Sequence, residues 1–425
     1  MKPFIVIFTL AISASLAAQV VQWRGPDRNG VFPDSGLMKT WPATGPELIY
    51  MTEGLGRSYA SAIATDQAVY VTGLIDSLEV LTCLGHDGQI RWQQSYGPAW
   101  DQSFPESRCT PTLEGNRIYV LSGKDNLVCF NASTGETLWQ VDIHMEYASV
   151  WDMFGVSESL LLTGDKLIVT PGGDETNVIA LDKHTGDLIW KSEPLMTERS
   201  NGSPVFFEND TMGLQQIIAM NRTHVLGVDP ENGEILWTRH YNKLDENGDN
   251  VTILANSPLF HEDDILISNG WDVPLVMLEL APDGRSVKTK YENYTLDNQN
   301  HGLVQMGEFV YGSNFLERNF GKWVCMRWEN GEIMWVVDWE NKGPVIAADG
   351  MLYMMDEKKG NMALVRANED GMEIVSSFRI EGGRGPFWAR PAIFSGRLYV
   401  RHGDALMVYN LKGQDHLQTI AATPR

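Results

Sequence analysis

The chain has 425 residues and a formal net charge of −22, from 33 lysine and arginine residues against 55 aspartate and glutamate residues. Affinity for nucleic acids comes from neutralising phosphates with cationic side chains, so this balance excludes nucleic-acid binding through a basic surface. With 43% hydrophobic and 21% charged residues, the composition is that of a globular protein and not of a disordered one. The 40 glycines and 14 tryptophans indicate an all-β protein with many turns.

The N-terminus has the pattern of a secretory signal. Lys2 precedes an apolar run over residues 4–10, small residues follow, and polar sequence begins at Gln19. We therefore predict a signal peptide over residues 1–18 and a soluble, exported protein that is periplasmic or extracellular. The apolar run is too short to span a membrane, and the predicted cleavage point has no lipid-anchor cysteine.

A glycine followed four residues later by a tryptophan recurs along the chain. This offset occurs in DGQIRW, TGETLW, TGDLIW, NGEILW and NGEIMW, which place tryptophans at Trp92, Trp139, Trp190, Trp237 and Trp335. Weaker copies without the tryptophan stand at Gly284, Gly371 and Gly413. Successive turn glycines are 40 to 51 residues apart, which is the length that one four-stranded propeller blade requires.

Each repeat is predicted to form four strands joined by tight turns, because glycine adopts positive φ angles without steric cost. Eight turn glycines predict a single eight-bladed β-propeller over residues 46–425, preceded by a leader over residues 19–45. Seven blades are the alternative, if one weak copy is an insertion. Little chain follows Gly413, so we expect a strand at residues 46–50 to complete the eighth blade, with Tyr50 in the tryptophan position.

The cysteines do not suggest disulfides or a zinc site. Cys83, Cys109, Cys129 and Cys325 contain no C-x-x-C pair. Cys129 and Cys325 occupy the same position of repeats that are four blades apart, and a disulfide needs Cα atoms within about 7 Å. We therefore predict four buried free thiols.

The repeat resembles that of the pyrroloquinoline-quinone (PQQ)-like β-propeller family. ALDKHTGDLIW, residues 180–190, matches the family repeat, and WRGPDRNGVFPDSGLMKTWP, residues 23–42, is similar to the leader of exported members. The resemblance implies that the repeat tryptophans pack between neighbouring blades. It leaves two functions open, because the family includes quinone-dependent alcohol and sugar dehydrogenases as well as cofactor-free propellers such as the scaffold lipoprotein of outer-membrane assembly.

A dehydrogenase of this family would need a Ca²⁺ ion held by a glutamate and an asparagine, and a cation beside the quinone. The loops that enter the innermost strands offer these polar candidates: Arg57, Arg108, Glu158, Asn201, Asn256, His301, Lys342 and Arg390. Glu158 and Asn256 are the candidate calcium ligands, and Arg108 or Lys342 is the candidate cation. The matching aspartate base and the adjacent cysteine pair of alcohol-oxidising relatives are missing, so we assign no catalytic residue.

We therefore favour an exported binding or scaffold module without a cofactor, and keep a Ca²⁺- and PQQ-dependent dehydrogenase of an alcohol or sugar as the alternative. The expected partner is a protein, or a small anionic or carbonyl-rich ligand at the cationic channel mouth. The aromatic-rich stretches at residues 96–104 and 147–154 are expected to rise from one face, either lining a groove or packing on each other. Residues 382–388 are expected to contribute from the far side of the ring.

Overall fold

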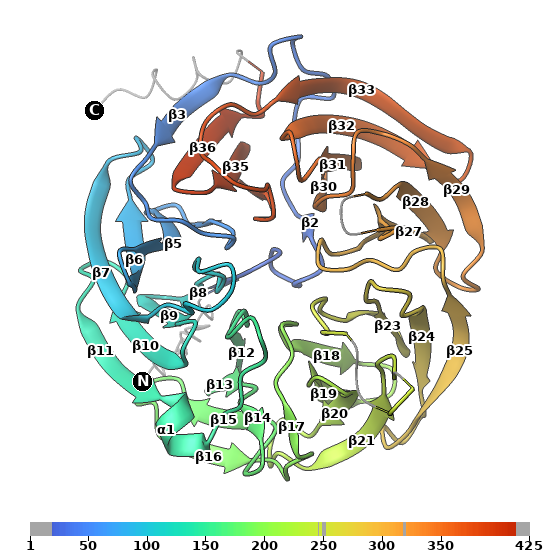
Figure 1. Cartoon of the computed structure of the whole chain (residues 1–425). Helices are drawn as coiled ribbons and strands as arrows, with labels where there is room; N and C mark the ends of the chain where they lie inside the picture. Colours follow the sequence, from blue (N-terminus) through green and yellow to red (C-terminus); the bar gives the residue numbers. More distant parts are fainter. Residues whose placement is uncertain (1–18, 245, 249–251, 318–319, 414–425) are drawn as a thin grey trace, which may run out of the picture.

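Figure 1 shows a computed structural model in which eight antiparallel sheets form a closed ring around a central axis. It describes residues 19–244, 246–248, 252–317 and 320–413, so the predicted signal peptide lies outside the described residues. The eight-bladed, all-β fold predicted from the repeat is confirmed, and the seven-bladed alternative is excluded.

Blades one to four follow one another along the chain, each beginning with its innermost strand. Blade one is β4 (Ile63–Ala64), β5 (Val69–Ile75), β6 (Leu78–Leu84) and β7 (Ile90–Pro98). Blade two is β8 (Thr112–Glu114), β9 (Arg117–Leu121), β10 (Asn126–Asn131) and β11 (Thr137–Asp142). Blade three is β12 (Leu161–Thr163), β13 (Lys166–Val169), β15 (Ile179–Asp182) and β16 (Leu188–Lys191). Blade four is β18 (Val205–Asn209), β19 (Leu214–Met220), β20 (His224–Val228) and β21 (Ile235–His240).

Blades five to eight repeat this order. Blade five is β22 (Leu259–His261), β23 (Asp264–Ile267), β24 (Leu275–Leu280) and β25 (Val287–Asn293). Blade six is β26 (Val304–Met306), β27 (Phe309–Ser313), β28 (Trp323–Arg327) and β29 (Ile333–Val337). Blade seven is β30 (Val345–Ala348), β31 (Met351–Met355), β32 (Asn361–Asn368) and β33 (Gly371–Arg379). Blade eight is β34 (Ala392–Phe394), β35 (Arg397–His402) and β36 (Ala405–Asn410), with β3 (Leu48–Thr52) as its outermost strand.

The N-terminal strand closes the ring as predicted. β3 pairs antiparallel with β36, so the first propeller strand completes the last blade. A Cβ atom at Gly88, the turn glycine of blade one, would lie 2.6 Å from the ring of Tyr50. Tyr50 therefore packs on the turn of the next blade. The β3–β36 pairing closes the ring through main-chain hydrogen bonds, without a covalent bond.

The repeat tryptophans show how neighbouring blades dock. The indole N–H groups of Trp92, Trp139 and Trp190 donate to main-chain carbonyls in the turns of the following blades, at 3.2, 3.3 and 3.0 Å. Trp335 does the same to Asn368, at 2.8 Å. Trp237 differs, because its N–H donates within its own blade, to Gln216 at 2.8 Å.

The residue opposite each tryptophan explains the small side chains of the repeat. Cys129 pairs with Trp139 and Cys325 with Trp335, and the strand register shifts directly after each cysteine. Gly227 holds the equivalent place opposite Trp237, where a Cβ atom would lie 2.2 Å from the indole nitrogen. The four cysteines are buried free thiols, as predicted.

The leader crosses the centre of the ring (Figure 1). β1 (Val20–Val21) adds to the innermost strand of blade two, and β2 (Val31–Phe32) adds to that of blade seven. Trp23 lies between these strands and is buried. The axial channel is therefore filled in part by the protein's own N-terminal segment, which the sequence did not predict.

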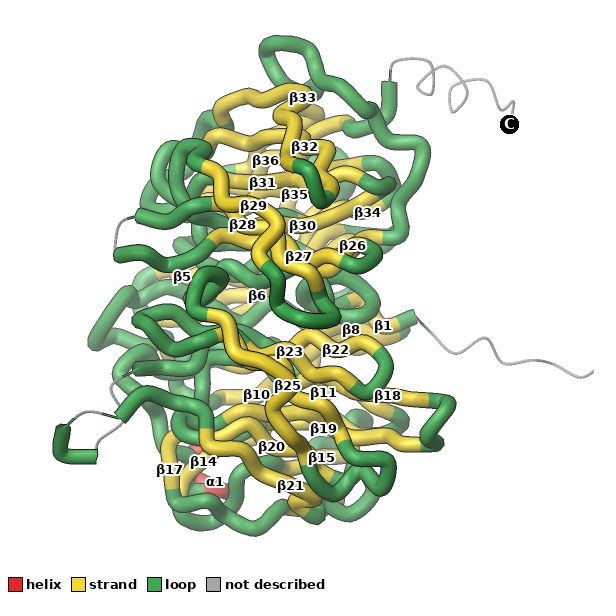
Figure 2. Tube along the Cα trace, turned by 90° about the vertical axis from the view of Figure 1, so that its right-hand side faces the viewer, coloured by secondary structure: helices red, strands yellow, loops and turns green. Residues whose placement is uncertain are grey.

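The ring has two different ends, seen from the side in Figure 2. We call loop face the end at which each outermost strand connects to the innermost strand of the next blade, and turn face the end with the turns between the first two strands. The helix α1 (Ile143–Tyr147) and the small sheet of β14 (Gly172–Gly173) and β17 (Thr197–Glu198) lie in loops of the loop face. No helical segment in the described part of the chain has the length and hydropathy needed to cross a bilayer.

Candidate binding site on the loop face

Two aromatic-rich loops meet on the loop face. Trp100 lies edge-on to Trp151, with 5.7 Å between ring centroids, and Phe104 lies 5.9 Å from Phe154. The two stretches therefore rise from the same face and pack on each other. The β9–β10 turn of blade two holds this arrangement in place, because Trp151 donates its N–H to the carboxylate of Asp125 at 2.5 Å.

Trp388 extends this aromatic row from the last blade. Its ring lies 5.5 Å from Phe104 and 4.9 Å from Tyr59, measured between centroids. The prediction that residues 382–388 act from the far side of the ring is wrong. The closed ring makes blade eight the direct neighbour of blade one, so the last loop reaches the first ones.

Arg108 fastens the two aromatic loops together. Its guanidinium donates to the main-chain carbonyl of Ser103 at 2.8 Å, and also to those of Phe104 and Phe154. Burial lowers the pKa of Arg108, although nearby carboxylates act in the opposite direction. The cation proposed to contact a quinone is therefore engaged in bracing the loop face.

Glu158 lies in a fully buried ion pair. Its Oε2 atom accepts hydrogen bonds from the Thr170 main-chain N–H at 3.1 Å, the Thr170 hydroxyl at 2.7 Å and Arg199 Nη2 at 2.6 Å. Arg199 also pairs with Asp125, and the three charged side chains are fully inaccessible. Burial raises the pKa of Glu158, while the Arg199 guanidinium opposes this rise.

Asn256 has a separate set of partners. Its amide group donates to the main-chain carbonyl of Asn298 at 2.5 Å and to the side-chain oxygen of Asn298 at 2.8 Å, and accepts from the Gly302 N–H at 3.2 Å. The described residues contain no group of three or more His, Cys, Asp or Glu side chains placed to hold a metal ion. Ca²⁺ at Glu158 would face the Arg199 guanidinium, and of the two carboxylate oxygens Oε1 alone has no hydrogen-bond partner among the described residues.

His301 and Lys342 meet at one carboxylate. Glu357 Oε2 lies 3.1 Å from His301 Nε2 and accepts the Trp388 N–H at 2.8 Å, and its Oε1 atom lies 4.0 Å from Lys342 Nζ. Burial lowers the pKa of His301, and it lowers that of Lys342 to about 8. The Lys342 ammonium also lies 3.9 Å above the ring of Phe315. This polar cluster ties blades six, seven and eight together beneath their loops.

Arg390 belongs to the channel and not to its mouth. It donates to the main-chain carbonyls of His301, at 3.1 Å, and Asn300, and its guanidinium lies 4.9 Å from the ring centroid of Trp23. The leader residues Arg24 and Arg28 lie 5.5 and 5.6 Å from the same ring.

The sequence did not identify the partners that define these arrangements. Arg199 pairs with Glu158 across 41 residues of chain, and Glu357 meets His301 across 56 residues and Lys342 within blade seven. Asn201, also predicted, donates to Asp152 and accepts from the Ser157 hydroxyl at 2.8 Å. The repeat gives the end of the ring on which a residue lies, but it gives no rule for the pairs between blades.

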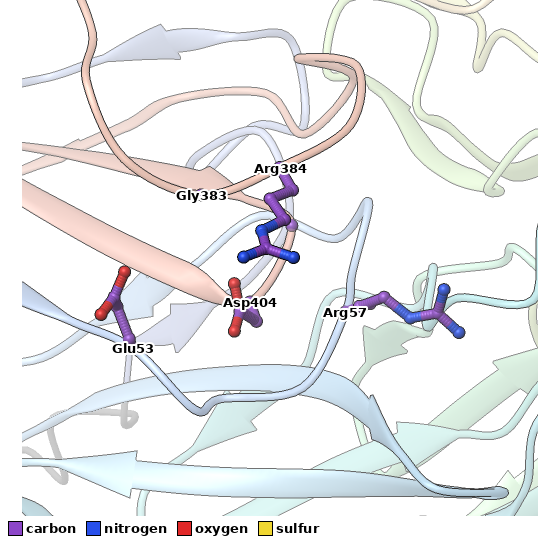
Figure 3. A pocket seen from close by; sticks show the side chains of 6 residues that line it. Glu53, Arg57, Gly383, Arg384 and Asp404 are labelled. Carbon is purple, nitrogen blue, oxygen red and sulfur yellow. The ribbon is translucent and has the colours of Figure 1, made fainter.

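A small charged cavity opens on the loop face between blades eight and one, with a volume of about 390 Å³. It is lined by Glu53, Arg57, Gly383, Arg384, Gly403 and Asp404. In Figure 3 the side chains of Arg384 and Asp404 point toward each other, whereas that of Arg57 points away from them. Arg57 instead lies 4.0 Å from Glu106, so the cations of this mouth have acidic neighbours.

Exposed apolar side chains stand on loops of the loop face from blade one to blade six. They are Phe104, Met145, Val150, Met153, Met196, Leu244, Tyr294 and Leu316. Met145, Met153 and Met196 are 77, 64 and 67% exposed. Monomeric proteins seldom expose large apolar side chains in adjacent loops without a binding role, and methionine adapts its shape to a partner surface.

Two curated proteins are similar in sequence to part of this chain. It is 24% identical over 188 residues to a quinoprotein ethanol dehydrogenase of Pseudomonas aeruginosa, a stretch that covers 39% of this chain and 30% of that protein. A second quinoprotein ethanol dehydrogenase, from Pseudomonas putida, is 26% identical over 161 residues, or 34% of this chain and 25% of that protein. The chain thus spans less than a third of the length of these curated relatives.

Solved structures share the fold. BamB from Moraxella catarrhalis superposes with a TM-score of 0.62 at 16% identity, over 86% of this chain and 99% of that one. A europium-containing methanol dehydrogenase superposes with a TM-score of 0.63 at 12% identity, over 91% of this chain and 90% of that one. A family profile described as outer membrane protein assembly factor BamB matches residues 77–336. This chain therefore belongs to the PQQ-like β-propeller family that this profile describes.

Proposed function

We propose that this chain is a binding or scaffold protein that holds a protein partner on its loop face and carries out no quinone chemistry. The observation that carries the proposal is the set of exposed apolar side chains on successive loops, of which Met153 and Met196 are among the most exposed. Arg108 and the aromatic pairs hold the loops of blades one to three in place, which lowers the entropic cost of binding. The family profile, described as an assembly factor, supports a partner of this kind.

The dehydrogenase alternative has less support in the residues. The chain resembles quinoprotein ethanol dehydrogenases over part of its length. However, Glu158 is neutralised by Arg199, and Asn256 is engaged by Asn298. The Arg199 guanidinium would repel a Ca²⁺ ion at Glu158, so we propose that the protein works without PQQ and Ca²⁺.

We propose further that the protein acts outside the cytoplasm. The support is the signal-like pattern at residues 1–18. A protein partner would then be periplasmic or extracellular.

Site-specific crosslinking tests the proposed partner surface. A photoreactive amino acid at Met153 or Met196 is expected to give one discrete crosslinked protein in cells, and the same residue at Leu188, an exposed position on the outer strand of blade three, is expected to give none. Met153→Glu should abolish the crosslink formed from position 196, and Leu188→Glu should not. Equal crosslinking from both surfaces would contradict the proposal. Reduction of a dye with an alcohol or sugar, dependent on added PQQ and Ca²⁺, would establish the dehydrogenase instead.

A further inference from the structure

A second cavity lies on the turn face, at the opposite end of the ring from the proposed partner surface. Its volume is about 360 Å³, and it is enclosed by the leader and by the innermost strands of blades one and eight. Its apolar wall includes Val21, Phe32, Ile63, Ala64 and Phe394. A concave, mostly apolar space of this size, with a few polar groups, has the properties of a ligand site.

The leader shows how a strand can occupy this region. β1 pairs antiparallel with β8 of blade two, and β2 pairs parallel with β30 of blade seven. Blades eight and one lie between these two in the ring, and their innermost strands β34 and β4 end their sheets, with no strand of the described chain paired on the channel side. An unpaired strand edge presents main-chain N–H and C=O groups that can bind an added strand.

Tyr399 contributes to the cavity wall and is only 1% exposed. Its hydroxyl is inaccessible and lies beside Arg397, so the residue adds wall to the cavity and no reachable hydrogen-bonding group.

The rim of the cavity is acidic. Asp34 and Asp66 both line it, and Asp66 is exposed in the turn between β4 and β5. Asp34 Oδ1 accepts the main-chain N–H of Gly396 at 2.6 Å, which fixes its carboxylate beside the opening. Carboxylates at the rim favour an occupant with a cationic end.

We infer that this turn-face cavity binds an extended apolar peptide segment of a partner protein, ending in a basic residue, which adds a strand to the free inner edge of blade one or eight. The apolar side chains fill the cavity, the main chain pairs with the free strand edge, and the basic residue lies near Asp66. The site lies at the far end of the ring from the loop face, so it does not depend on the proposed function.

Calorimetry with a synthetic peptide tests the inference in the full-length protein. The probe is acetyl-Val-Ile-Val-Lys-amide, and the matched control is the same peptide with N-methyl groups on alternate peptide bonds, which cannot pair with a strand edge. We expect saturable binding of the probe, weakened at least tenfold by N-methylation. Equal binding of both peptides, or no binding of the probe at millimolar concentration, would overturn the inference.

Two mild substitutions and one spectroscopic measurement locate the site. Asp66→Lys should weaken probe binding about fivefold through the loss of an opposite charge at the rim. Glu262→Lys, the same charge reversal in the corresponding turn of blade five, should leave binding unchanged. In methyl NMR spectra of the wild type, the probe should shift Ile63 and Ile393 but not Ile265. Shifts confined to other methyl groups would also overturn the inference.

Discussion

Arg199 and Glu158 form an ion pair in which both side chains are fully buried, with 2.6 Å between Nη2 and Oε2. The same guanidinium neutralises Asp125, so one arginine stands between two carboxylates from blades two and three. Burying a charged side chain costs desolvation free energy. The three charges are tolerated because the arginine offsets this cost for both carboxylates, and the carboxylates offset it for the arginine. Glu158 is thereby a structural residue as much as a candidate ligand.

Removing Arg199 should be among the most damaging single changes in the chain. Arg199→Met leaves Glu158 and Asp125 buried without a counter-charge, so the free energy of unfolding should fall by about 3–5 kcal/mol. Urea-induced unfolding, followed by tryptophan fluorescence, measures this loss. Arg222→Met, which breaks the partly exposed pair with Glu198, should cost less than about 1 kcal/mol. A loss of unfolding free energy in Arg199→Met as small as that in Arg222→Met would show that the buried triad contributes little to stability.

The sequence predicted the architecture well because every blade needs the same turn glycine and the same docking side chain, and both recur along the chain. The spacing of a turn glycine and a tryptophan recurs five times and defines the length of one blade. The strand that precedes the first repeat has no blade of its own, and this predicts ring closure through Tyr50. The pairs at the centre could not be predicted in this way, since Arg199 meets Glu158 across 41 residues of chain and the repeat does not say which residues of neighbouring blades meet. The leader itself was predicted, but its path through the channel was missed, because two-residue strands such as β1 and β2 have no periodicity to read.

Blade docking through turn glycines can be tested within blade three. Gly186 has a φ of +82°, and a Cβ atom there would lie 2.8 Å from the Trp139 ring. Gly186→Ala should therefore lower the free energy of unfolding by about 2–4 kcal/mol, from backbone strain together with displacement of the indole. Differential scanning calorimetry measures the effect.

Gly164 provides the matched control for this change. It lies in the same blade with a φ of +56°, but a Cβ atom there would meet nothing within 4 Å. Gly164→Ala should cost about 1 kcal/mol from the backbone alone. If the two variants are equally stable, contact between Trp139 and the turn contributes nothing to blade docking.

Asp297 should make stability depend on pH in a direction opposite to that of most carboxylates. Burial raises the pKa of Asp297 to about 7, whereas an unfolded chain gives about 3.9. Between these two pKa values the folded protein holds a proton on Asp297 that the unfolded chain has lost. The free energy of unfolding therefore falls as the pH rises toward 7.

Asp297→Asn removes that dependence. The variant should gain about 2 kcal/mol relative to wild type when the pH is raised from 5 to 8, measured by urea unfolding at each pH. Asp349→Asn gives a control of opposite sign, because the hydrogen bond from Lys39 lowers the pKa of Asp349. That variant should lose stability relative to wild type as the pH rises from 3 to 5. A difference between wild type and Asp297→Asn that stays constant with pH would contradict the assignment.

Arg28 should hold the leader in the channel. Its guanidinium donates to the main-chain carbonyls of Ser159 at 2.6 Å and Leu160 at 2.9 Å, and so ties the segment between β1 and β2 to blade three. Arg28→Ala removes both hydrogen bonds, and among the described residues only the Leu160 carbonyl keeps another donor, the Thr112 hydroxyl at 2.7 Å, so the local opening of the leader should rise by tenfold or more. Hydrogen exchange read by mass spectrometry should show faster exchange in residues 19–33 and unchanged exchange in β35 and β36. Arg285→Ala, which removes an exposed pair with Glu234 on the outside of the ring, should leave the leader unchanged. Protection of residues 19–33 that survives Arg28→Ala would mean that pairing of β1 and β2 with the blades is enough to hold the segment in place.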